Sequence, residues 1–87
     1  MSVVNVEPFD ELIDRLRAQG YSIDAESISS LRTAMWTTSS EMVGELGLAI
    51  MKFQSQNPAA PDELKLNLAR CMKEVRKVWP GIRSPFS

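Results

Sequence analysis

The residue types that most often carry out chemistry in proteins are scarce in this chain. It contains no histidine and a single cysteine, Cys71. Without histidine, the commonest general base and the commonest transition-metal ligand are both missing. Cys71 has no histidine to activate its thiol and falls on an apolar stripe, so we expect a buried structural cysteine. The sequence therefore predicts a protein that is not an enzyme and that needs no metal or other cofactor.

Two groups of polar residues have a simpler explanation than catalysis. The run of hydroxyl side chains from 37 to 40 could supply a nucleophile, but capping of a helix explains it without a missing base. Glu41 and Glu45 are four residues apart, which places their carboxylates on one face of a helix. Metal sites in helical bundles combine such carboxylates with Glu-x-x-His motifs from several helices. We therefore expect the two glutamates to form a solvated acidic face.

Two glycines and two tryptophans could form a surface for a partner. Gly44 and Gly47 would let a second helix approach closely, either within the bundle or across an interface between two chains. Trp36 and Trp79 stand at expected helix ends, where an indole either closes the core or anchors an interface. Two apolar residues near the end of the chain extend this group: Ile82 and Phe86.

Charge is divided unevenly along the chain. Residues 1–50 hold three basic and eight acidic residues, whereas residues 51–87 hold seven basic and three acidic ones. Bases near a helix C-terminus complement the helix dipole, but they could also bind an acidic protein or nucleic acid through salt-sensitive contacts. The net charge of −1 gives no general attraction to nucleic acid. The basic residues in question are Arg70, Lys73, Arg76, Lys77 and Arg83.

Four helices are expected to position these residues, over about 8–19, 25–35, 39–54 and 61–78. Each range has apolar residues at the spacing of one helix face, and no stretch alternates with period two for long enough to form a strand. The residues expected on the buried faces are Phe9, Leu12, Ile13 and Leu16; Ile28, Leu31 and Met35; Met42, Val43, Leu46, Ala49, Ile50 and Phe53; and Leu64, Leu68, Cys71, Met72, Val75 and Val78.

The expected helix boundaries follow from capping signals. Gly20 is placed as the left-handed residue that ends the first helix. Asp24 is a suitable N-cap for the second. Thr38 and Glu41 have the spacing of a capping box before the third, and Pro61 suits the start of the fourth.

We predict an all-α protein, a compact bundle of about four short helices. Residues 1–87 form one domain, with loosely packed or flexible ends at 1–7 and 80–87. A single cysteine fits a reducing compartment. The first residues lack the pattern of a signal peptide, and no apolar stretch is long enough to span a membrane. These features predict a cytoplasmic protein with no membrane association.

The function favoured by these observations is a small, non-enzymatic protein–protein interaction or regulatory module. A concrete form is an antidote or immunity-type protein that covers a toxin or an enzyme, and the partner is another protein or a second copy of the chain. The alternatives are a nucleic-acid-associated protein that uses the basic end of the last helix, and a carrier of a small ligand. The residues expected to contact a partner are Trp36, Gly44, Gly47, Arg70, Lys73, Arg76, Lys77 and Trp79.

Overall fold

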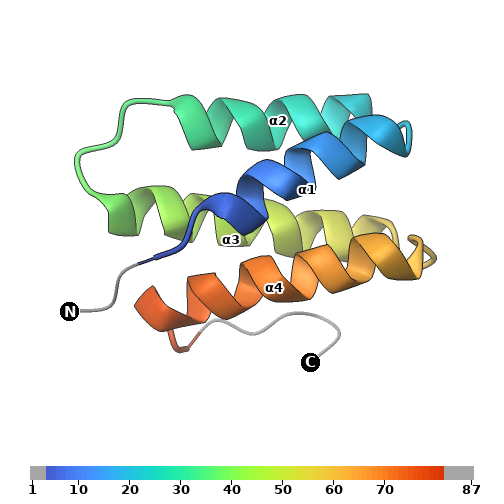
Figure 1. The fold of residues 1–87 in the computed structure, drawn as a ribbon. Coiled ribbons are helices and arrows are strands. Elements are labelled where there is room, and N and C mark those ends of the chain that lie inside the picture. Colours follow the sequence, from blue (N-terminus) through green and yellow to red (C-terminus); the bar gives the residue numbers. More distant parts are fainter. Residues whose placement is uncertain (1–3, 82–87) are drawn as a thin grey trace.

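The computed structural model describes residues 4–81, and these form four helices without a strand. The helices are α1 (Glu7–Ala18), α2 (Ser22–Thr33), α3 (Ser39–Gln56) and α4 (Asp62–Val78). Each helix packs against two others, because α1 contacts α2 and α4 while α3 contacts α2 and α4. The four helices thus form a closed ring around one core (Figure 1). The predicted all-α bundle of four short helices is confirmed.

Several predicted boundary signals are found in the structure. Gly20 has a φ of 89°, the left-handed conformation that favours glycine, and it follows the end of α1. The Thr38 hydroxyl oxygen accepts a hydrogen bond from the backbone N–H of Glu41 at 3.2 Å, so Thr38 caps α3. Pro61 is the residue immediately before α4. These local interactions set where the long helices begin, and therefore which side chains face the core.

The second helix departs from the prediction at both ends. It begins at Ser22, so Asp24 lies in its first turn and is not the N-cap, which is Tyr21. The helix ends at Thr33 because Ala34 is extended, with φ −65° and ψ 156°. The apolar spacing continues to Met35, but the helix does not, and Met35 is fully exposed. The prediction that Met35 belongs to the buried stripe was therefore wrong.

The core draws on all four helices, and α1 is a full member of it. Phe9, Leu12 and Leu16 have no exposed surface, so the predicted apolar face of the first helix is confirmed. Tyr21 meets the ring of Phe53 edge-on, with ring centroids 5.2 Å apart. The buried apolar residues are Phe9, Leu12, Ile13, Leu16, Ala25, Ile28, Val43, Leu46, Ile50, Phe53, Ala60, Leu64, Leu68, Cys71, Met72 and Val75.

The segment before α1 is attached to α4. The backbone N–H of Asn5 donates to the Glu74 carboxylate at 2.9 Å, and Val4 and Val6 pack against the core while partly buried. Of the ends expected to be loosely packed, residues 1–3 and 82–87 lie outside the described residues, and with them Ile82, Arg83 and Phe86. Over the residues that are described, no helix is both long and apolar enough to cross a membrane.

Candidate functional site

Gly47 lies where α3 and α4 cross. It is buried, and a Cβ atom at this position would stand only 2.7 Å from Cγ1 of Val75 on α4. A C–C contact at optimal distance is about 3.5–4.0 Å, so only glycine leaves room for Val75 here. Gly47 therefore serves the close crossing inside the bundle, and its surface is not open to a partner.

Gly44, nearly one turn before Gly47, accommodates Trp79. Trp79 is the residue that follows the last turn of α4, and its indole lies against the first turns of α3. The indole Nε1–H donates to the carbonyl oxygen of Ser40 at 2.9 Å. A Cβ at Gly44 would stand 3.1 Å from the same Nε1 atom. Trp79 is thus held against α3 and keeps 43% of its surface exposed.

Trp36 is held in a similar way from the loop between α2 and α3. Its Nε1–H donates to the carbonyl oxygen of Leu31 at 2.7 Å. Leu31 is in the last turn of α2, where carbonyl groups lack intrahelical partners. The indole therefore satisfies the end of one helix, while the ring itself is only partly buried.

The two indoles border a hollow of about 460 Å³ on the surface of α3. Leu48, which is 52% exposed, and Gly44 are one turn apart on the same helix face and contribute apolar surface. Glu41 and Glu45, also one turn apart, contribute the charged groups. We call this hollow the tryptophan groove. Its lining residues are Trp36, Glu41, Gly44, Glu45, Leu48 and Trp79.

The tryptophan groove has an unusual balance of polar groups. Both indole N–H groups are engaged with backbone carbonyls, so the rings present their apolar faces and edges. Among the lining residues the ionisable groups are the carboxylates of Glu41 and Glu45, and none is basic. The groove is therefore an apolar surface with a negative border.

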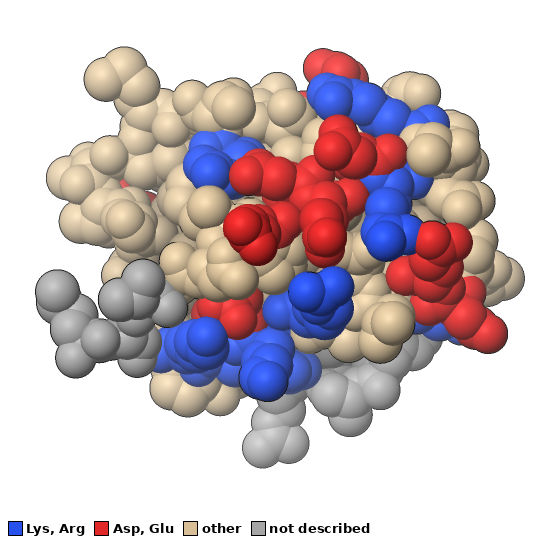
Figure 2. Space-filling model, viewed as in Figure 1, with Lys and Arg blue, Asp and Glu red and all other residues tan. Residues whose placement is uncertain are grey.

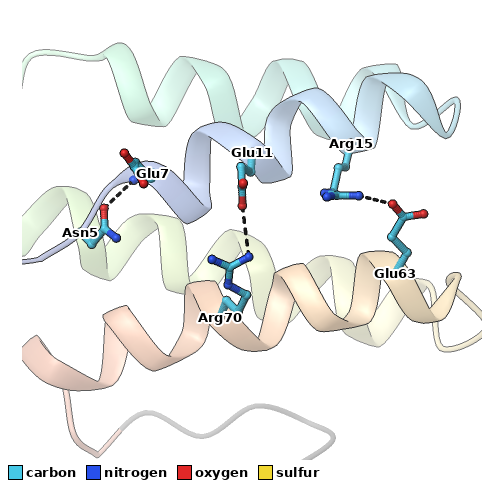
Figure 3. A network of polar contacts seen from close by, with 6 residues as sticks. All are labelled: Asn5, Glu7, Glu11, Arg15, Glu63 and Arg70. Carbon is cyan, nitrogen blue, oxygen red and sulfur yellow. Dashed lines mark hydrogen bonds and ion pairs between the residues drawn. The ribbon is translucent and has the colours of Figure 1, made fainter.

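The basic residues of α4 lie elsewhere and are partly paired with acids. Arg70 Nη1 stands 3.4 Å from the Glu11 carboxylate of α1, and Arg15 of α1 pairs with Glu63 at the start of α4 (Figure 3). Figure 2 shows acidic side chains gathered over α1, directly beside basic side chains along α4. Charges that are far apart in sequence thus meet on one face and offset each other.

The remaining members of the predicted basic cluster are distributed around α4. Lys77 donates to both carboxylate oxygens of Glu74, at 2.9 and 3.0 Å, while Arg76 is partly buried and Lys73 is exposed. Glu74 itself is buried. The hydrogen bond from Asn5, followed by that from Lys77, holds the pKa of Glu74 below its ordinary value. The residues that line the tryptophan groove do not include any of the predicted basic residues Arg70, Lys73, Arg76 and Lys77.

Cys71 is withdrawn from any surface. It is completely buried, and this burial raises the pKa of its thiol to about 12. The prediction of a buried structural cysteine is confirmed. Over residues 4–81, no three acidic or cysteine side chains gather in a group that could hold a metal ion.

Comparisons with protein-family models, with curated proteins and with solved structures gave no match for this chain. The groove itself therefore carries the functional argument. Sequence reasoning singled out Trp36, Gly44 and Trp79, which the structure brings together. It missed Leu48, although the four-residue spacing from Gly44 would have placed both on one helix face. It also treated the two glutamates as an isolated pair, whereas they border the same hollow.

Proposed function

We propose that this protein is an interaction module that binds a partner protein in the tryptophan groove. The observation that carries the proposal is the pair of indoles held in place by backbone hydrogen bonds beside an exposed leucine. Tryptophan is enriched among the residues that dominate binding energy at protein interfaces. Side chains already held in one position lose little further freedom on binding, which favours affinity.

The same surface gives little support to an enzymatic role. Glu41 and Glu45 are exposed, the chain has no histidine, and Cys71 is enclosed in the core. We therefore propose a non-enzymatic function. An antidote or immunity-type protein, which covers the surface of a toxin or an enzyme, is a concrete form of it. A cytoplasmic location belongs to the same proposal, since a single unpaired cysteine fits a reducing compartment.

The nucleic-acid alternative has weaker support. A phosphate backbone is bound by unpaired lysine and arginine side chains, but Arg70 and Lys77 already contact Glu11 and Glu74. The acidic side chains over α1 lie beside this cluster (Figure 2) and would repel a polyanion. A protein partner in the groove agrees better with this distribution of charge.

The proposal is tested with two leucines that differ in position. Leu48 is 52% exposed in the groove, and Leu66 on α4 is 66% exposed outside it. Proteins captured from an extract of the source cells would be identified and purified, and their binding to the wild type and to Leu48→Lys and Leu66→Lys would be measured by calorimetry. Circular dichroism would establish that both variants fold.

We expect Leu48→Lys to weaken binding of the true partner by at least about tenfold, as at an interface centre. Leu66→Lys should bind as the wild type does. A purified partner that binds Leu48→Lys as tightly as the wild type would show that the groove is not the interface. Failure of the wild type to bind any purified candidate would also contradict the proposal.

A further inference from the structure

We infer that the tryptophan groove receives an arginine side chain of the partner protein. This inference rests on the proposed function and specifies the chemistry of the partner. It starts from two properties of the groove taken together, the two indole rings and the two carboxylates at its border.

The indole rings favour a cation over a neutral polar group. The face of an indole attracts cations, and guanidinium groups in particular stack on it. Because the indole N–H of Trp36 donates to Leu31 and that of Trp79 donates to Ser40, the rings have no donor left for an acceptor on the partner. An acidic or carbonyl-bearing side chain would find no hydrogen-bond donor on these rings.

The carboxylates select the same kind of group. Glu41 and Glu45 project from successive turns of α3 on one side of the groove. A guanidinium group has five N–H donors in a rigid plane and can pair with a carboxylate through two parallel hydrogen bonds. An ammonium group of lysine offers a point charge instead, and it is more strongly hydrated. The combination of flat rings and carboxylates therefore favours arginine.

The apolar part of the groove suits the stem of the same residue and its neighbour. Leu48 and Gly44 contribute the apolar part of the lining that comes from α3. The methylene groups of arginine pack on apolar surface while the charged end reaches a partner. A hollow of about 460 Å³ has the size of an ordinary binding pocket. It would hold the arginine together with one adjacent apolar side chain.

The experiment uses short alanine-rich peptides and the protein's own fluorescence. Trp36 and Trp79 are the two tryptophans of the chain, so fluorescence reports on the groove directly. The test peptide carries one leucine and one arginine. Matched peptides replace the arginine with lysine or with citrulline, which has nearly the same shape but no charge. Titrations would extend to about 5 mM, because a contact centred on one residue gives weak affinity.

We expect the arginine peptide to bind more tightly than the lysine peptide, and both to bind more tightly than the citrulline peptide. Changing Glu41 and Glu45 together to glutamine should weaken binding of the arginine peptide about fivefold to tenfold, since each exposed charge pair contributes little alone. Binding of the citrulline peptide should stay the same. The control is Glu7→Gln with Asp14→Asn on α1, which removes the same charge away from the groove and should leave all three affinities unchanged.

Three results would overturn the inference, and they are distinguishable from failure of the proposed function. Equal binding of the arginine and citrulline peptides, abolished by Leu48→Lys, would mean that the groove is an interface that binds an apolar residue and not an arginine. If the α1 control weakened binding of the arginine peptide as much as the glutamine changes in the groove do, the effect would come from the net charge of the protein. No fluorescence change with the arginine peptide, while the purified partner still depends on Leu48, would exclude arginine and keep the interface.

Discussion

Replacing Gly47 with alanine should have opposite effects on stability in two backgrounds. In the wild type the new Cβ would stand 2.7 Å from Cγ1 and 3.4 Å from Cγ2 of Val75. In a Val75→Ala background both of these methyl groups are gone. The nearest remaining atom is the Cβ of residue 75, at 3.6 Å, which is an ordinary van der Waals contact.

The magnitudes follow from two opposing terms. Alanine is a better helix former than glycine by about 1 kcal/mol, whereas forcing an extra methyl group into a packed contact costs about 1–3 kcal/mol. We therefore expect Gly47→Ala to destabilise the wild type by about 1 kcal/mol, as the difference between the two terms. In the Val75→Ala background the clash is absent, so the same change should stabilise by up to about 1 kcal/mol. The coupling between the two positions is then about 2 kcal/mol.

Urea unfolding of the four proteins, followed by circular dichroism, would give this double-mutant cycle. Ile13→Val is the control partner, because Ile13 is on α1 and α1 does not contact α3. The changes in the free energy of unfolding caused by Ile13→Val and by Gly47→Ala should add within about 0.5 kcal/mol. The reasoning is refuted if Gly47→Ala stabilises the wild type, or if its effect is the same with and without the Val75 methyl groups.

Three further predictions concern single side chains. Cys71, buried and with a thiol pKa of about 12, should react with a thiol reagent far more slowly in the native protein than in denaturant; fast native labelling would contradict its burial. Because the pKa of Glu74 is lowered in the folded state, its ionised form contributes stability that is present above the unfolded pKa and is lost as the pH falls through the folded pKa. Glu74→Gln should therefore make the melting temperature less dependent on pH as the pH is lowered below the ordinary pKa of a glutamate, whereas an unchanged slope would mean that the hydrogen bonds of Glu74 do not form. Thr38→Ala removes the cap of α3 and should cost about 1 kcal/mol in chemical unfolding, with Thr37→Ala as a neutral control; equal losses would argue against capping by Thr38.

The fold could be predicted because apolar spacing records which face of each helix is buried. The same signal failed at Met35, where the spacing continues after the extended Ala34 has ended the helix. Apolar spacing shows which side of a helix is buried as long as the helix continues. It gives no information about where the backbone leaves the helical conformation.

The sequence pointed to several residues of the candidate groove, but it did not predict that they lie together. Trp36 and Trp79 are each conspicuous in the sequence, but they share a hollow only because α2, α3 and α4 are packed in one arrangement. Gly44 and Gly47 have equivalent local signals, yet one lies under an exposed indole and the other under Val75. Such differences depend on contacts between helices, which no local pattern contains.

The closed ring of helices also has a consequence for how the chain folds. Three of its four contacts join consecutive helices, and the fourth joins the first helix to the last. Next to that final contact, the segment before α1 adds a hydrogen bond between residues 69 positions apart, from Asn5 to Glu74. Bringing distant residues together costs the conformational entropy of the segment between them, and this cost precedes the favourable contact. Helices that are neighbours in sequence lose less entropy when they pair. We therefore expect docking of α1 onto α4 to limit the folding rate, and stopped-flow refolding should then be slowed more by substitutions along that seam than by those between α2 and α3.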